Sequence, residues 1–152
     1  NWKKLYDEVR SFKETAGKIK IKAILGVGDL ETLRNVAKAS LVCMMAGADF
    51  IKTSTGKEST NANLNNSLVM LRMIREFHGK TGKKIGFKPA GGISTAKSVL
   101  EFLILVAEEL GFDWVKPNLL RIGASSLLID IERQLYHYTS GRYANKEKLA
   151  IG

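Results

Sequence analysis

Segments with helical and strand-like patterns alternate along the whole chain, and this alternation is the feature that most constrains its fold. Apolar residues recur at helical spacing in five segments, residues 2–15, 31–44, 65–78, 95–110 and 126–138. The second of these helices could open at Asp29 or at Glu31, and either Ser94 or Thr95 could cap the fourth. Short apolar runs typical of buried strands separate the five segments, at residues 20–27, 48–52, 85–88 and 119–122. No hairpin turn joins two of these strands, so each strand must reach the next through a helix. The pattern predicts an α/β fold with about four parallel strands.

Two architectures fit a parallel sheet of this kind, the doubly wound sheet and the (β/α)8 barrel. A complete barrel needs roughly 200 residues or more, whereas this chain has 152. Four strand–helix units correspond to half of a barrel. We expect one partial domain over residues 1–152, with a flexible tail at 144–152. Because residue 1 is Asn and the opening segment resembles mid-domain sequence, we also expect a piece of a longer protein.

The composition excludes several classes of protein. Hydrophobic residues make up 45% and charged residues 26% of the chain, as in globular proteins. No apolar run approaches the roughly 20 residues of a membrane span. Cys43 is the only cysteine and lies among apolar residues, so we expect a core position and a reducing cytoplasm. No Cys/His cluster has the spacing of metal ligands, so we expect no metal site.

The formal net charge of +9 has two interpretations. It describes either a solvated, lysine-rich surface or an attraction for an anionic partner. The sequence has neither the basic–aromatic pattern of RNA-recognition modules nor a zinc finger, which argues against nucleic acid. A small phosphorylated substrate fits the charge better.

Two lysines occupy equivalent positions in consecutive strands. Lys52 ends the segment 48–52, and Lys88 ends the segment 85–88. Neighbouring strands lie about 4.8 Å apart, so the two side chains should meet where barrel enzymes keep their active sites. Two ammonium groups this close disfavour each other's charge, which favours one neutral amine near pH 7. Lysines at strand ends that merely reach solvent are the alternative.

Glycine-rich turns follow the last two strands and predict an anion site. Backbone N–H groups and small hydroxyls at such turns bind phosphate, and these loops carry the usual phosphate site of the barrel. Tight packing of the chain is the alternative role for such small residues. The polar turn after Lys52 could add hydroxyls and a third cation. The candidate substrate-binding residues are Thr53, Lys57, Gly91, Gly92, Gly123, Ser125 and Ser126.

Three motifs together resemble the deoxyribose-phosphate aldolase family. Residues 48–57 (ADFIKTSTGK) resemble the family's Schiff-base strand. Residues 86–92 (GFKPAGG) are similar to its second lysine strand, and residues 121–126 (RIGASS) to its terminal phosphate loop. The motifs keep the family's order and spacing, the resemblance covers residues 19–143, and the animal-type members are the most similar.

The resemblance implies a function and a role for each matching residue. Lys52 would form the imine, Lys88 would assist it, and Lys57 with the glycine and serine turns would hold the phosphate of 2-deoxy-D-ribose 5-phosphate. The family needs no cofactor or metal, because the protonated imine itself accepts the electrons. Ser94 departs from the arginine that some members carry.

The family's catalytic aspartate belongs to the first half of its barrel, and no carboxylate here matches it. We therefore expect weak or no activity from this chain alone, and pairing of two copies as one way to cover the open sheet edges. The main alternative is a non-catalytic, phosphate-binding half-barrel. Another Schiff-base aldolase and a basic nucleic-acid binder are further alternatives.

Overall fold

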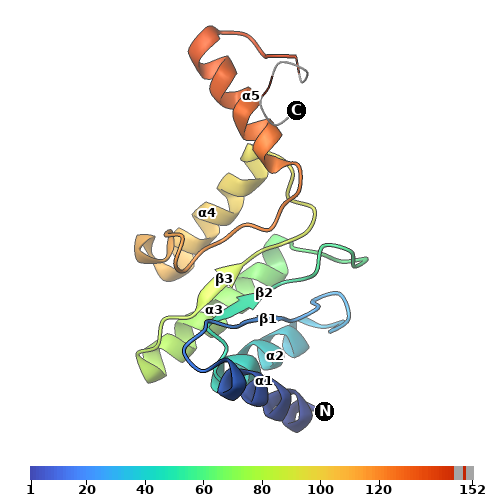
Figure 1. The fold of residues 1–152 in the computed structure, drawn as a ribbon, viewed down its shortest axis with the longest axis vertical. Helices are drawn as coiled ribbons and strands as arrows, with labels where there is room; N and C mark the ends of the chain where they lie inside the picture. Colours follow the sequence, from blue (N-terminus) through green and yellow to red (C-terminus); the bar gives the residue numbers. More distant parts are fainter. Residues whose placement is uncertain (146–148, 150–152) are drawn as a thin grey trace.

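The computed structural model describes residues 1–145 and 149 (Figure 1). Helices and strands alternate along the chain as the sequence predicts, and a single 3-10 turn, η1, precedes the last helix. The elements are α1 (Trp2–Ala16), β1 (Lys22–Ile24), α2 (Leu33–Met45), β2 (Phe50–Lys52), α3 (Leu64–Thr81), β3 (Gly86–Lys88), α4 (Ala96–Leu110), η1 (Phe112–Trp114) and α5 (Leu127–Ser140).

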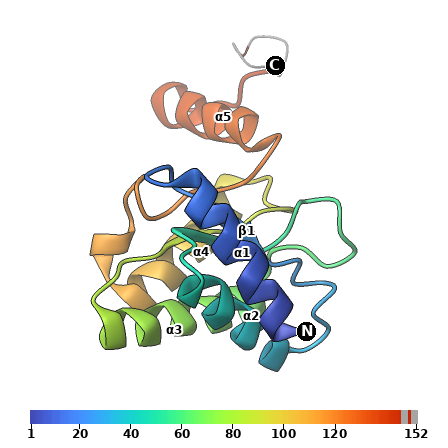
Figure 2. The ribbon, with the colours of Figure 1, turned by 60° about the horizontal axis from the view of Figure 1, so that its bottom comes forward.

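The three strands form one parallel sheet in the order β1-β2-β3. The predicted α/β fold with parallel strands is therefore confirmed. In both views of the ribbon, α1, α2 and α3 lie together beside the sheet, and α5 extends away from it (Figures 1 and 2). Strand order follows chain order, so each crossover helix returns the chain to the next neighbouring strand.

The predicted fourth strand, residues 119–122, is the one predicted strand that does not form a regular strand of the sheet. It pairs with the β3 segment only through two isolated parallel bridges, Phe87 with Leu120 and Ala90 with Gly123. Both bridges have the same register, so the segment lies where a fourth strand would lie. Pro89 interrupts the pairing between them, because proline has no N–H to donate to the next chain.

Helix starts are set by side-chain caps rather than by the first apolar residue. The side chain of Thr32 accepts a hydrogen bond from the Asn35 N–H, so α2 starts at Leu33 and not at either predicted start, Asp29 or Glu31. Glu31 itself has a φ of 61°, which a helix excludes. Thr95 caps α4 in the same way, as one of the two predicted alternatives. The last helix starts at Leu127, directly after the glycine–serine turn.

The core lies on one face of the sheet, as the alternation of side chains along a strand requires. Ile51 and Phe87 are fully buried and belong to the apolar cluster that α2 and α3 complete with side chains such as Cys43, Met70 and Ile74. The next position along each strand faces the other way. Consequently, the side chains of Lys52 and Lys88 lie on the face that bears the candidate site.

The buried Cys43 thiol gives a pH-dependent prediction. The cysteine is 1% exposed, and burial raises the pKa of its thiol from 9.0 to about 11. At pH 8 the thiolate fraction is then about a hundredfold lower than in the unfolded chain, so alkylation by iodoacetamide should be slower by at least that factor. Since the folded state holds the thiol neutral, its stability should fall as the pH rises from 9 to 11. Mass spectrometry of labelled protein, with and without denaturant, checks the rates, and equal rates would contradict the buried position.

The C-terminal end of the chain is described only in part. Most of the predicted flexible tail, residues 144–152, lies outside the described residues. Ala144, which is described, is buried. Within residues 1–145, no helix has the length and apolarity to cross a membrane.

Candidate active site

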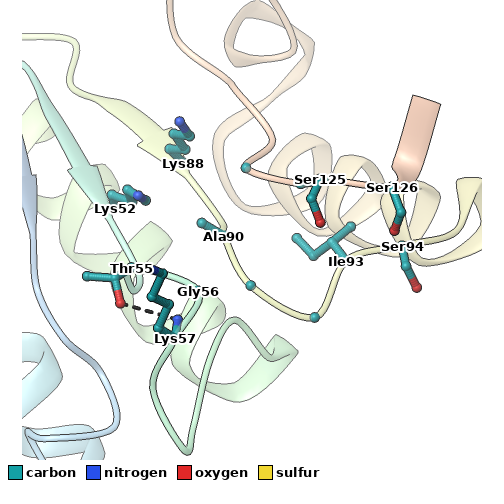
Figure 3. Close-up of a pocket in the computed structure, with 14 residues that line it drawn as sticks. Lys52, Thr55, Gly56, Lys57, Lys88, Ala90, Ile93, Ser94, Ser125 and Ser126 are labelled. Carbon is teal, nitrogen blue, oxygen red and sulfur yellow. Dashed lines mark hydrogen bonds between the residues drawn. The ribbon is translucent and has the colours of Figure 1, made fainter. Parts of the chain in front are cut away.

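The two strand-end lysines are direct partners across the sheet. The register pairs Lys52 of β2 with Lys88 of β3, and Ile24 of β1 flanks Lys52 on the other side. The backbone fixes this pairing, because the Thr53 N–H donates to the Lys88 carbonyl at 3.2 Å and the Leu25 N–H donates to the Lys52 carbonyl at 2.9 Å. Both side chains extend from neighbouring strands toward the same open region (Figure 3).

The lysines line a pocket of about 500 Å³ at the carboxyl ends of the strands. All but one of the residues selected from the sequence lie on its wall. These are Lys52, Lys57, Lys88, Gly91, Gly92, Gly123, Ser125 and Ser126. The structure thus brings together motifs that are more than 70 residues apart in the chain.

Thr53 is the exception, and its role is structural. The side chain is fully buried, and its hydroxyl donates to the Ala90 carbonyl at 3.2 Å and accepts from the Ala90 N–H at 3.0 Å. The neighbouring Ser54 hydroxyl also donates to the Ala90 carbonyl, at 2.6 Å. Because side chains alternate along a strand, the residue after Lys52 faces the core rather than the pocket. Thr53 therefore positions the turn after β3 and does not line the pocket.

The glycines of the two turns allow a close approach of backbones. Gly91 has a φ of 89°, and a Cβ atom there would lie 2.4 Å from Oδ1 of Asn61. A Cβ on Gly123 would lie 2.6 Å from that of Ala90 and 3.1 Å from Cε of Lys88. Any larger residue at position 123 would push against the candidate catalytic lysine. The turns thus need glycine for packing. The Gly91 and Gly123 N–H groups themselves donate to the Gly123 and Pro89 carbonyls.

The loop that carries Lys57 is held by a carboxylate that the sequence analysis did not select. Oε1 of Glu58 accepts from the Thr55 N–H at 2.8 Å and from the Thr55 hydroxyl at 3.1 Å. The Lys57 N–H in turn donates to the Thr55 hydroxyl at 3.3 Å (Figure 3). Thr55, Ile93 and Ser94 also line the pocket, although the sequence analysis did not select them as binding residues. Thr55 lies in the polar turn after Lys52, and Ser94 departs from an arginine of the family, so the sequence offered a signal for these two and none for Ile93 beyond its place next to a selected turn.

Two more cations lie near the lysine pair, around the ring of Phe50. Nζ of Lys22 lies 5.8 Å and Cζ of Arg121 lies 5.0 Å from the ring centroid. Burial, followed by the charges of Lys88, Arg121 and Lys52, lowers the pKa of Lys22. Lys22 lies in the same row of the sheet as Phe50, and Arg121 lies in the same row as Lys88, all on one face. The sequence analysis did not select these two residues, because the register of the strands is what groups them.

The electrostatic character of the pocket is uniformly basic. No Asp or Glu side chain of the described residues lines it. Lys52, Lys57 and Lys88 form no ion pair with any acidic group in residues 1–145. The described part of the chain also contains no group of three His, Cys, Asp or Glu residues that could hold a metal ion. The arrangement offers amines and anion-binding groups, but no carboxylate for proton transfer.

Curated proteins resemble this chain closely over most of its length. It is 62% identical over 143 residues to the deoxyribose-phosphate aldolase of Homo sapiens and 60% identical over 143 residues to that of Bos taurus. Both alignments cover 94% of this chain and 45% of the relative. The chain therefore spans about half the length of the curated relatives it matches.

Solved structures share the fold. The apo form of a protein from Toxoplasma gondii superposes with a TM-score of 0.78 at 22% identity, over 93% of this chain and 54% of the other. A tetrameric deoxyribose phosphate aldolase from Aeropyrum pernix gives a TM-score of 0.57 at 22% identity, over 90% of this chain and 50% of the other. The family model described as DeoC/LacD family aldolase matches residues 1–128. The chain thus belongs to the DeoC/LacD family of aldolases, as its three motifs indicated.

Proposed function

We propose that this chain is the C-terminal half-barrel of a class I deoxyribose-phosphate aldolase. The observation that carries the proposal is the pairing of Lys52 with Lys88 on the wall of a basic pocket that ends in two glycine-rich turns. The identity to the animal aldolases supports the choice of substrate, 2-deoxy-D-ribose 5-phosphate. The products would be glyceraldehyde 3-phosphate and acetaldehyde.

In the proposed mechanism, the Nζ amine of Lys52 attacks the carbonyl carbon of the open-chain sugar. Loss of water gives an imine, which a proton converts to an iminium ion. When the bond between the second and third carbons breaks, its electron pair moves toward the iminium nitrogen and leaves an enamine. A base takes the proton of the third-carbon hydroxyl, which becomes the aldehyde of the departing glyceraldehyde 3-phosphate. Protonation of the enamine and hydrolysis then release acetaldehyde and the free lysine.

The other residues of the pocket support this chemistry. Lys88 is the direct partner of Lys52 in the register and lines the same pocket, so its side chain can exchange protons with the reacting groups. The N–H groups and hydroxyls of the two turns, together with Lys57, suit the phosphate group. These roles need no cofactor and no metal, because the iminium nitrogen accepts the electrons.

The half-barrel assignment sets limits on activity. General acid–base catalysis typically contributes 10²–10⁴-fold to a rate, and the described pocket lining has no carboxylate to supply it. We therefore propose that the carboxylate comes from the part of the barrel beyond this chain or from a second copy of it. Since Cys43 is a buried free thiol, a cytoplasmic location fits the proposal.

A non-catalytic, phosphate-binding half-barrel is the alternative function. It would use the glycine and serine turns, but it would not need two lysines in register. The lysine pair therefore favours the aldolase.

Comparison of substrates tests the proposed function. The protein should cleave deoxyribose 5-phosphate and release acetaldehyde, detected by a coupled alcohol dehydrogenase assay, in preference to ribose 5-phosphate and fructose 1,6-bisphosphate. The 152-residue chain should be slower by about 10²-fold or more than the protein at its natural length. If the natural-length protein binds these sugar phosphates but cleaves none of them, the phosphate-binding alternative is correct.

A further inference from the structure

A second pocket, of about 210 Å³, adjoins the first at its serine end. Ser94 and Ser126 line both pockets, so an anion bound between the two turns would face both spaces. The second pocket is completed by α5, which contributes Ile129, Asp130 and Arg133. None of the motifs selected from the sequence includes these three residues.

Arg133 carries the uncompensated charge of this second pocket. In the described part of the chain its guanidinium takes part in none of the ion pairs, and Nε is buried without a hydrogen-bond acceptor. The guanidinium carbon lies 5.6 Å from the centroid of the Tyr143 ring. A buried donor without an acceptor is unfavourable. An anion beside this arginine would therefore be stabilised.

Asp130 is the carboxylate that lines this pocket together with Arg133, and it already accepts a hydrogen bond from the backbone. Its Oδ2 accepts from the Ala96 N–H at 2.7 Å, which joins the first turn of α5 to the start of α4. No ion pair between Asp130 and Arg133 is present within 4.0 Å in the residues described. The arginine thus keeps its charge available for a ligand.

The lysines of the first pocket all lie away from the end formed by Ser94 and Ser126, so that end has no cation from the first pocket's lining. Lys52, Lys57 and Lys88 extend from the strand ends and the loop after β2, whereas Ser94 and Ser126 lie on the opposite side of the pocket (Figure 3). A phosphate dianion at that end would contact only neutral donors from the first pocket. A guanidinium suits phosphate because its planar fork donates two parallel hydrogen bonds.

We propose that Arg133 is a phosphate-binding residue of this site, and that it makes the protein prefer a phosphorylated over an unphosphorylated sugar. The guanidinium reaches the phosphate oxygens from α5, across the second pocket, on the side where Ser94 and Ser126 stand. The identity of the sugar rests on the proposed function. The contact between Arg133 and phosphate does not.

Binding of inorganic phosphate to the protein at its natural length tests the contact without any catalysis. Titration calorimetry should show Arg133→Gln weakening phosphate roughly tenfold, with Arg133→Lys between the two. Arg142→Gln removes the same charge from an exposed position just beyond the end of α5 and should change nothing. Adding Ser94→Arg to Arg133→Gln should restore binding, because residue 94 lines the same pocket. Such a rescue would also show that the single variant is folded.

Cleavage kinetics test the preference. In Arg133→Gln, the kcat/KM for deoxyribose 5-phosphate divided by that for deoxyribose should fall roughly tenfold, through the KM of the phosphorylated sugar. The inference is overturned if phosphate affinity changes less than twofold, or if both sugars lose equally. If the wild-type protein cleaves neither sugar while Arg133→Gln still weakens phosphate, the proposed function fails and this inference stands.

Discussion

Replacing Lys52 with alanine should abolish the covalent adduct that this protein forms with acetaldehyde and borohydride. Borohydride reduces an imine to a stable amine, so intact and peptide mass spectrometry identify the lysine that reacted. Since Lys52 is the proposed nucleophile, Lys52→Ala should also lower the cleavage of deoxyribose 5-phosphate by about 10⁴-fold or more, as loss of a covalent nucleophile does in other enzymes. The side chain is only partly buried, so the variant should fold.

Two other lysines serve as comparisons in the same experiment. Lys83 is exposed and precedes β3, at the opposite end from the pocket, so Lys83→Ala should leave the adduct and the rate unchanged. Lys88→Met should keep the adduct on Lys52 but form it more slowly, because the neighbouring amine that can exchange protons with the reacting groups is gone. An adduct that persists unchanged in Lys52→Ala, or that is spread over surface lysines, would refute the assigned nucleophile.

Replacing Gly86 with alanine should destabilise the fold by about 3 kcal/mol, at the upper end of what overpacking costs. Gly86 pairs with Phe50 in the sheet, and the ring of Phe50 lies over the glycine. A Cβ at position 86 would lie 2.2 Å from Cε1 of that ring. The ring is 3% exposed and lies between Lys22 and Arg121, so it has little room to move. Urea unfolding measures the loss.

A double-mutant cycle separates this clash from a general cost of alanine. In a Phe50→Leu background the ring is absent, so the cost of Gly86→Ala should fall by more than half. Gly79→Ala provides a control, because a Cβ at that helical position meets nothing within 4 Å. That substitution should stabilise the fold by about 0.5–1 kcal/mol. A cost of Gly86→Ala that is the same with phenylalanine or leucine at position 50 would exclude the clash.

The sequence by itself determined the order of elements and most of the pocket. Periodicity and caps depend on residues near in sequence, so the alternation of helices and strands and the start of α4 could be predicted. The matched positions of Lys52 and Lys88 predicted a shared site because equivalent strand ends meet in any parallel sheet. The family motifs added the candidate phosphate turns. The sequence also contains Pro89, which interrupts the pairing with the fourth strand. Its effect could not be predicted, because it depends on which segment of the chain lies beside it.

Only the tertiary structure decided which side chains face the pocket and which polar or charged groups pair with one another. Thr53 follows Lys52 in the motif, yet strand alternation directs it to Ala90 and the core. Arg133 lies far from every motif and reaches the serine end only because α5 packs beside the start of α4. Such positions depend on register and on contacts between elements distant in sequence, which local patterns do not encode.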